Sequence, residues 1–238
     1  VCIGFSNQAS IFTPNVPVPK SIDITGKLIL KYYAPCTQSF GIHFQQYNPQ
    51  IFTPLISAEV RGLKTKNEGF YLIYLPAYSV EKIISVFKHF EKERFVVFSD
   101  VKQLILKRNI RIYPLDRAAF LKQLSACGGV ITAAGFSTVA DTLYLKKKLL
   151  VIPQKNQFEQ KCNAFALKKM GVPIIKKLKK KYIPDLLSWM DSSSIVKVNY
   201  PDNSESIAKT IINAGLAASR KQPTFFPSPD YNLQLAEK

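Results

Sequence analysis

The chain has 238 residues, of which 47% are hydrophobic, so it can bury one large core or two smaller ones. No stretch approaches the roughly 20 consecutive apolar residues that cross a membrane. The composition therefore excludes a wholly disordered chain and a hydrophobic transmembrane helix.

The formal net charge is +17, and it comes largely from lysines. Two runs stand out, one at Lys146–Lys148 and one at Lys176–Lys181. Such charge attracts anionic membranes or phosphorylated substrates, although a solvated lysine-rich surface explains it equally well. Arginine is scarce and no aromatic stacking platform accompanies the runs, so we do not expect nucleic acid as a partner.

The four cysteines are widely spaced, without a CxxC pair or a neighbouring histidine. We therefore expect neither a zinc site nor a disulfide framework, and a reduced, cytoplasmic protein. They are Cys2, Cys36, Cys127 and Cys162.

The first third of the chain gives mixed signals. It opens on a short apolar run at Val1–Phe5, and a proline-rich stretch follows. The segment Lys27–Ala34 fits a helix or a strand, Phe40–Phe44 predicts a strand, and Ile51–Ile56 predicts an extended connector. Because the apolar run begins at the first residue, we expect further sequence upstream.

From Gly69 onward, short apolar segments alternate with amphipathic ones. The apolar segments predict strands buried on both faces. They span 70–75, 95–98, 109–113, 129–132 and 149–152. Apolar residues at helical spacing predict helices over 80–90, 117–125, 137–147, 158–170, 183–190 and 204–218.

This alternation predicts an α/β fold with a doubly wound, Rossmann-like parallel sheet and helices on both faces. We expect residues 58–222 to form this domain. Residues 1–57 are expected to be the remnant of a truncated second Rossmann-like domain with its linker, and residues 223–238 a C-terminal tail.

Ligands of open α/β sheets bind beyond the carboxyl ends of the strands, and one such loop carries a glycine turn. Gly135 and Phe136 precede Ser137 and Thr138 at the start of a predicted helix. We expect Gly135 to allow a tight turn and the two hydroxyls to cap the helix or contact a ligand. The free N–H groups of this helix end favour a diphosphate, although an ordinary capped helix has the same pattern.

Polar residues around this loop suit the remainder of a hydroxyl-rich ligand. Asp141 lies one helical turn after Ser137, where its carboxylate can accept hydrogen bonds from ribose. Glu159, Gln160 and Asn163 are expected on the polar face of the helix that begins at residue 158.

The block 129–174, GVITAAGFSTVADTLYLKKKLLVIPQKNQFEQKCNAFALKKMGVPI, resembles the donor-binding region of glycosyltransferase family 28. That family includes the bacterial transferase that adds N-acetylglucosamine to lipid I. The resemblance covers about 45 residues closely and implies a GT-B fold whose amino-terminal part is missing.

The resemblance also implies roles for particular residues. Gly135, Phe136, Ser137 and Thr138 would bind the donor diphosphate, and Asp141 the ribose. Pro114 and Leu115 would lie beside the uracil. Glu159 and Gln160 would contact the hydroxyls of the donor sugar, with Asn163 supporting their loop.

Two features depart from the family pattern. The loop after the first strand of the domain is Pro76-Ala77-Tyr78-Ser79, in which only Ser79 can replace the usual phosphate contact. The glycine-rich opening that carries the proposed base in many relatives is absent, so no catalytic residue is assigned. His43 fits a structural role better than a ligand contact, and we expect His89 at the surface.

The resemblance implies a hexosyltransferase that moves a hexose or N-acetylhexosamine from a UDP-sugar to a hydroxyl acceptor. No DxD-type acidic pair follows a strand, so we expect neither a metal nor a cofactor. The charge and the resemblance suggest a lipid-linked acceptor and peripheral association with the inner face of a membrane. The alternatives are a UDP-sugar 2-epimerase of the same fold, a non-catalytic nucleotide-sugar-binding module, and a membrane-surface binder; if it is a transferase, this chain alone is expected to be weakly active or inactive.

Overall fold

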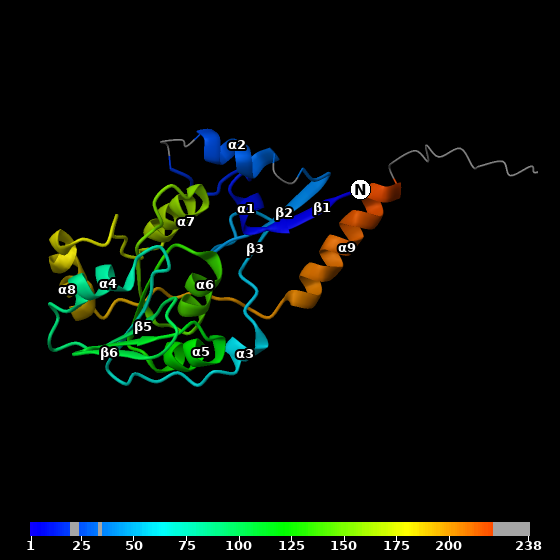
Figure 1. The fold of residues 1–238 in the computed structure, drawn as a ribbon. Coiled ribbons are helices and arrows are strands. Elements are labelled where there is room, and N and C mark those ends of the chain that lie inside the picture. Colours follow the sequence, from blue (N-terminus) through cyan, green and yellow to red (C-terminus); the bar gives the residue numbers. More distant parts are fainter. Residues whose placement is uncertain (20–23, 33–34, 221–238) are drawn as a thin grey trace, which may run out of the picture.

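The computed structural model describes residues 1–19, 24–32 and 35–220, and within them two sheets follow one another along the chain (Figure 1). The first is a small parallel sheet in the order β1-β2-β3. Its strands and the nearby helices are β1 (Ile3–Ser6), α1 (Asn7–Ser10), α2 (Ile24–Tyr32), β2 (Gln38–Ile42) and β3 (Ile51–Phe52). The short helix α3 (Ala58–Arg61) follows, and its Val60 belongs to a core of the large sheet.

The second sheet has six strands in the order β6-β7-β5-β4-β8-β9. Its strands are β4 (Tyr71–Tyr74), β5 (Phe95–Phe98), β6 (Ile105–Lys107), β7 (Ile110–Tyr113), β8 (Gly129–Thr132) and β9 (Lys148–Val151). The associated helices are α4 (Val80–Phe87), α5 (Arg117–Ala126), α6 (Phe136–Tyr144), α7 (Phe158–Lys169), the 3₁₀ helix η1 (Lys180–Tyr182), α8 (Ile183–Asp191) and α9 (Ser204–Arg220).

The chain winds outward from β4 in both directions. It first builds β5 and β7 on one side, and then returns to place β8 and β9 on the other. All these pairs are parallel, whereas β6 pairs antiparallel to β7 at the edge. The strand order therefore reverses between β4 and β8, which is the point where open α/β sheets bind ligands.

Successive residues of a strand point to opposite sides of a sheet. Because the strands are continuous apolar runs, both faces of the large sheet are apolar. Leu72 belongs to the core beneath α5 and α6, whereas Ile73 belongs to the core beneath α4 and α8. Gly129 matters on the second side, because a Cβ at this position would lie 3.1 Å from Trp189 of α8. The fold is thus the predicted three-layer α/β arrangement.

The five predicted strands and six predicted helices of this domain are all present. The predicted ends of α4 and α6 were each wrong by three residues, since α4 ends at Phe87 and α6 at Tyr144. After α6, Lys146 takes a φ of +54°, outside the helical region. The edge strand β6 was not predicted, because it has three residues and its side chains are mostly exposed. Of the segment 27–34, which fitted a helix or a strand, residues 27–32 lie in α2, and residues 33–34 lie outside the described residues.

The Lys146–Lys148 run does not form a basic surface. Lys147 is only 6% exposed, and its Nζ donates to the carbonyl oxygens of Lys66, Ser125 and Cys127 at 2.6–2.8 Å. Lys148 donates to the carbonyl oxygen of Met190 at 2.6 Å. The interpretation of this run as a solvated or anion-attracting patch was wrong, because two of its three ammonium groups donate to backbone carbonyl oxygens of neighbouring segments.

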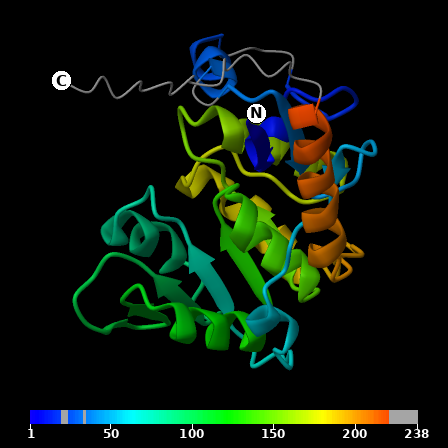
Figure 2. The same cartoon turned by 90° about the vertical axis from the view of Figure 1, so that its right-hand side faces the viewer.

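The last helix returns to the small sheet. α9 extends from the large-sheet part of the molecule to β1, which it contacts (Figures 1 and 2). The predicted tail at 223–238 lies outside the described residues, and the predicted domain boundaries stay predictions. Within the described ranges, no helix is long and apolar enough to span a membrane.

We predict that Lys147→Met lowers the free energy of unfolding by about 3 kcal/mol, because it leaves buried carbonyl groups without their donor. Urea denaturation followed by circular dichroism measures the change. Lys146→Met, at an exposed neighbouring position, is the control and should change stability by less than about 0.5 kcal/mol. Equal stabilities for the two variants would contradict the structural role of Lys147.

Candidate functional site

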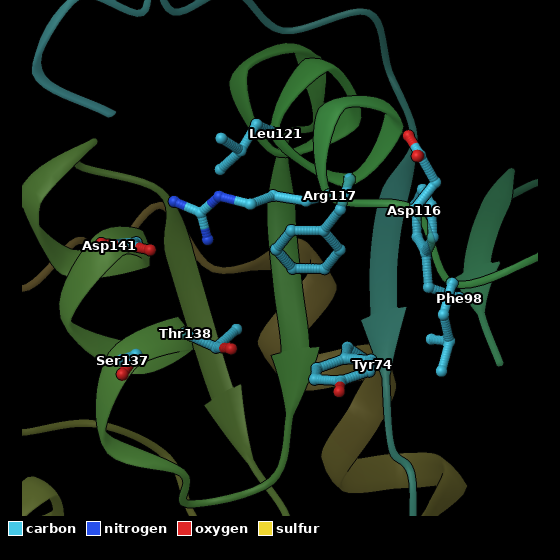
Figure 3. Close-up of a pocket in the computed structure, with 10 residues that line it drawn as sticks. Tyr74, Phe98, Asp116, Arg117, Leu121, Ser137, Thr138 and Asp141 are labelled. Carbon is cyan, nitrogen blue, oxygen red and sulfur yellow. The ribbon is translucent and has the colours of Figure 1, made fainter. Parts of the chain in front are cut away.

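A cavity of about 320 Å³ opens beside the reversal point of the large sheet (Figure 3). It lies between α5 and α6, next to the carboxyl ends of β4 and β5. Its lining residues are Tyr74, Phe98, Leu115, Asp116, Arg117, Phe120, Leu121, Ser137, Thr138 and Asp141. Four residues singled out in the sequence therefore share one cavity: Leu115, Ser137, Thr138 and Asp141.

The amino-terminal end of α6 has no side-chain cap. Gly135 is the N-cap residue, so the expectation that Ser137 or Thr138 caps the helix was wrong. Gly135 has a φ of −69°, which any residue can adopt, so a tight turn does not explain the glycine either. A Cβ at this position would meet no protein atom within 4 Å, and the backbone is therefore open to a ligand.

Phe136, the first residue of α6, has an aromatic partner in the segment that carries β1 to β3, called here the small sheet part. Its ring stacks on that of Phe44, with the centroids 4.9 Å apart. Phe44 is in turn held by Tyr200, whose hydroxyl donates to the Phe44 carbonyl oxygen at 3.0 Å. The side chain of Phe136 thus fixes the helix end, and only its backbone is available to the predicted diphosphate.

Asp141 lies one turn further along α6, on the wall of the cavity. Burial raises the pKa of its carboxyl group to about 6, although the Arg117 guanidinium opposes this shift and Glu59 adds to it. Arg117 points toward Asp141 across the cavity (Figure 3). Its Nε also donates to Glu59 Oε2 at 3.0 Å, so the cavity wall carries a positive charge shared between two acids.

Aromatic rings line the part of the cavity over the sheet. Phe120 packs edge-to-face against both Tyr74 and Phe98, with centroid distances of 5.5 and 5.3 Å. Leu115 is exposed and borders the same cavity. Pro114 is half-buried and is not among the residues that line the cavity. The arrangement offers apolar surface on which a flat ring can pack.

Ser79 lies in a neighbouring cavity of about 450 Å³, which shares Tyr74, Phe98 and Leu115 with the first. It is the N-cap of α4, and its hydroxyl accepts a hydrogen bond from Lys82 N at 3.3 Å. The structure therefore does not bring Ser79 into the cavity that holds Ser137.

The predicted polar face of α7 is in fact largely buried. Gln160 is 8% exposed, and its Oε1 accepts from the backbone N–H groups of Ala134 and Gln154, at 3.2 and 2.9 Å. Asn163 is fully buried and donates to the Ala134 carbonyl oxygen at 3.0 Å. The position on a polar helix face expected for these two amides was wrong, because both are buried and fasten the loop before α6 to the start of α7.

Glu159 is placed differently from these two residues. Its Oε2 accepts a hydrogen bond from Gln8 Nε2 of α1 at 3.1 Å, which links the large and small sheet parts. Beside this contact, Ile11 packs with Phe158 and Cys162.

The two histidines have different environments. His43 is 1% exposed and packs between Phe44 and Tyr47, and burial lowers its pKa to about 4. It therefore presents almost no surface to a ligand, in keeping with a structural role. His89 is exposed, as the sequence predicted.

The aromatic lining and the pair Asp116 and Arg117 were not predicted from the sequence. Asp116 caps α5 by accepting from Ala119 N at 2.7 Å. Arg117 begins that helix directly after the carboxyl end of β7, and its place in the chain was a signal that could have identified it. The aromatic residues gave none, because strand and helix residues of this type usually belong to the core.

Comparison with known proteins identifies the family. The sequence model described as Glycosyl transferase family 1 matches residues 25–191. The chain belongs to this family. The family assignment agrees with the expected class of transferase, but it does not extend to the resemblance to family 28.

Solved glycosyltransferases share the fold. Spinosyn forosaminyltransferase SpnP has a TM-score of 0.50 at 12% identity, over 86% of this chain and 65% of its own. SnogD from Streptomyces nogalater has a TM-score of 0.42 at 14% identity, over 82% of this chain and 56% of its own. The likeness to SpnP shows a GT-B fold for this member of glycosyl transferase family 1.

The chain spans between about half and two thirds of the length of these solved structures. No curated protein sequence matches it.

We predict that Asp141→Asn stabilises the protein at pH 7.5 more than at pH 5. The folded state binds the Asp141 proton more tightly than the unfolded state, so its stability falls as pH rises toward the folded pKa of about 6. Asparagine removes this loss. After allowance for solvent screening of a partly exposed group, we expect a gain of about 1 kcal/mol, or a few degrees in Tm.

Thermal unfolding at both pH values measures this difference. Asp100→Asn, which removes an exposed carboxylate from the loop after β5, is the control. If Asp141→Asn and the control shift Tm by the same amounts at pH 5 and pH 7.5, the Asp141 carboxyl group is not destabilised by burial.

Proposed function

We propose that the protein is a glycosyltransferase that moves a sugar from a UDP-type donor to a hydroxyl acceptor. The family and the GT-B fold support the class of reaction. The observation that carries the proposal is the uncapped end of α6 at Gly135, because it opens beside a cavity of a size suited to part of a nucleotide.

The donor diphosphate would bind at this helix end. The first N–H groups of an α-helix have no partner within the helix, and its dipole favours negative charge. Gly135 lets a phosphate approach the backbone, and the hydroxyls of Ser137 and Thr138 line the adjoining space. The amide groups would also stabilise the leaving diphosphate, and we propose that transfer needs no metal.

The nucleoside would occupy the cavity between α5 and α6. In this arrangement the Asp141 carboxylate accepts hydrogen bonds from the ribose hydroxyls, while the base packs near Leu115 and the neighbouring aromatic rings. We assign uracil, with Pro114 at the edge of its site, because of the resemblance to family 28. Ser79 would contact the donor only through the adjoining cavity.

The donor sugar would extend from the diphosphate toward α7. Glu159 is the predicted sugar-binding residue whose carboxylate contacts the small sheet part, through Gln8. Gln160 and Asn163 would act on the sugar by positioning the Ala134 backbone rather than through their own amide groups, which are already engaged there.

We further propose a lipid-linked acceptor and attachment to an anionic membrane surface. The support is the second lysine run, in which Lys176, Lys177 and Lys179–Lys181 are all exposed. This segment follows Ile174, which pairs parallel to Val151 of β9, so the lysines emerge at the carboxyl edge of the sheet. The donor would bind at the same edge.

Nucleotide titration by calorimetry tests the diphosphate site. We predict that the wild-type protein binds UDP at least tenfold more tightly than UMP, because UMP lacks the second phosphate. Gly135→Val should reduce this ratio to near one, since the new side chain fills the approach to the backbone. The Tm of this variant should change little, because the added Cβ meets no protein atom within 4 Å.

Two further titrations sharpen the result. TDP in place of UDP decides between thymine and uracil, and UDP binding in EDTA should equal binding in Mg²⁺ if no metal takes part. An unchanged ratio of UDP to UMP affinity in Gly135→Val would place the diphosphate elsewhere and defeat the proposal.

Vesicle sedimentation tests the membrane surface. We expect binding to vesicles of phosphatidylcholine with phosphatidylglycerol, and at least tenfold weaker binding when the five exposed lysines of the second run are changed to glutamine. The control changes five exposed lysines elsewhere: Lys64, Lys92, Lys102, Lys168 and Lys169. Equal losses for both variants would mean that only the net charge matters.

A further inference from the structure

A further pocket, lined largely by polar residues, lies at the amino-terminal edge of the large sheet, opposite the edge that carries the candidate site. Its volume is about 230 Å³. It adjoins the first residues of β5, Arg111 and Tyr113 of β7, and the carboxyl-terminal half of α5. The lining residues are Glu68, Phe70, Arg94, Phe95, Val96, Arg108, Asn109, Arg111, Tyr113 and Gln123.

Arginine is concentrated in this pocket. The chain contains 27 lysines but only six arginines, and three of the six line this space: Arg94, Arg108 and Arg111. A guanidinium group presents several N–H donors in a planar fork that matches the oxygens of a phosphate, whereas lysine acts as a point charge. The enrichment therefore concerns the side chain best suited to bind an oxyanion.

Arg94 is held in position by the backbone. Its Nε donates to the Gly69 carbonyl oxygen at 3.3 Å, and its Nη2 donates to the Glu68 carbonyl oxygen. Among the described residues, neither Arg108 nor Arg111 has a side-chain hydrogen bond or an ion pair. One guanidinium group is thus fixed, and two are available to a ligand.

The acid in the pocket does not neutralise these charges. Glu68 forms an ion pair with Lys66, outside the pocket lining. The hydrogen bond from Lys66 and the nearby charges of Lys66, Arg94 and Lys122 hold the pKa of Glu68 below its ordinary value. The surroundings are therefore positive, and the like charges of the arginines repel one another unless an anion lies between them.

Arg108 also occupies an unfavourable backbone position. It has a φ of +48° in the tight turn between β6 and β7, where glycine or asparagine is usual. Asn109 fixes the turn by donating from Nδ2 to the carbonyl oxygens of Phe90 and Glu93, at 2.8 and 2.9 Å. An arginine therefore lines the pocket from a backbone position that glycine or asparagine would adopt at a lower energetic cost.

We propose that this pocket binds the phosphate group of a monoester, with Arg108 and Arg111 as its charged donors and Arg94 as a fixed positive wall. Tyr113 and Gln123 supply further hydrogen-bonding groups on the same lining. The site is separate from the proposed donor site and does not depend on the proposed function.

The test uses inorganic phosphate as the probe. In ¹⁵N-resolved NMR at constant ionic strength, phosphate should shift the side-chain amides of Asn109 and Gln123 and the backbone amide of Arg111 in a saturable way. Arg111→Gln should weaken this binding at least tenfold. Arg220→Gln, which removes an exposed arginine at the end of α9, is the matched control and should bind like the wild type.

Arg108→Asn separates binding from folding. Asparagine tolerates a positive φ, so this variant should unfold at the same or a higher temperature while it binds phosphate at least tenfold more weakly. Shifts confined to Gly135–Thr138, equal weakening by Arg220→Gln, or wild-type affinity in both pocket variants would overturn the proposal.

Two arms identify the source of the phosphate. Glycerol phosphate represents a soluble monoester, and vesicles of phosphatidylcholine with phosphatidic acid represent a lipid headgroup. Arg111-dependent binding of either one supports the pocket and names its source. If neither binds in an Arg111-dependent manner, the proposal fails.

Discussion

The candidate site depends on two buried amide side chains of α7. Gln160 accepts from the N–H of Ala134, and Asn163 donates to the carbonyl oxygen of the same residue. Both groups of one residue, immediately before the N-cap of α6, are therefore fixed from outside the helix. Because buried polar groups are costly to leave unpaired, this loop cannot move without losing two hydrogen bonds. Helix α6 thus begins from a fixed support, and its exposed amide groups keep a constant direction.

The strand order places this support at the point where the sheet reverses its winding direction. β8 leads into α6 and pairs with β4, and the chain reverses its winding direction between them. The loops after these two strands therefore diverge, which leaves room for the cavity beside α6. Aromatic side chains from β4, β5 and α5 line the cavity where it adjoins the sheet, and Asp141 and Arg117 form its charged wall. One topological feature thus brings together an uncapped helix end, a flat apolar surface and an ionisable group.

The large sheet could be predicted from the sequence because each of its strands, β6 excepted, is a short apolar run between amphipathic segments. Leu72 and Ile73 show why: both neighbours are buried, one on each face, so the run is continuous. β6 could not be predicted, since Leu106 and Lys107 are exposed and carry no pattern. The burial of Gln160, Asn163 and Lys147 was also missed. Polar residues normally indicate solvent, and only the position of a facing carbonyl or N–H group shows otherwise.

Part of the site followed from spacing and part did not. Ser137, Thr138 and Asp141 share a cavity because Asp141 lies about one turn after the two hydroxyl residues on a single helix. This spacing can be read from the sequence alone. Gly135 does not form the expected tight turn, because its φ is ordinary, and the open space beside it is a tertiary feature that spacing does not report. The separation of Ser79 from this cavity likewise depends on how α4 packs, which local patterns do not report.

The stack of Phe44 on Phe136 has a consequence for how the two sheet parts communicate. Phe136 is both the first residue of α6 and the contact through which the small sheet part touches that helix. The stacked rings therefore tie the small sheet to the first residue of α6, next to the open space at Gly135.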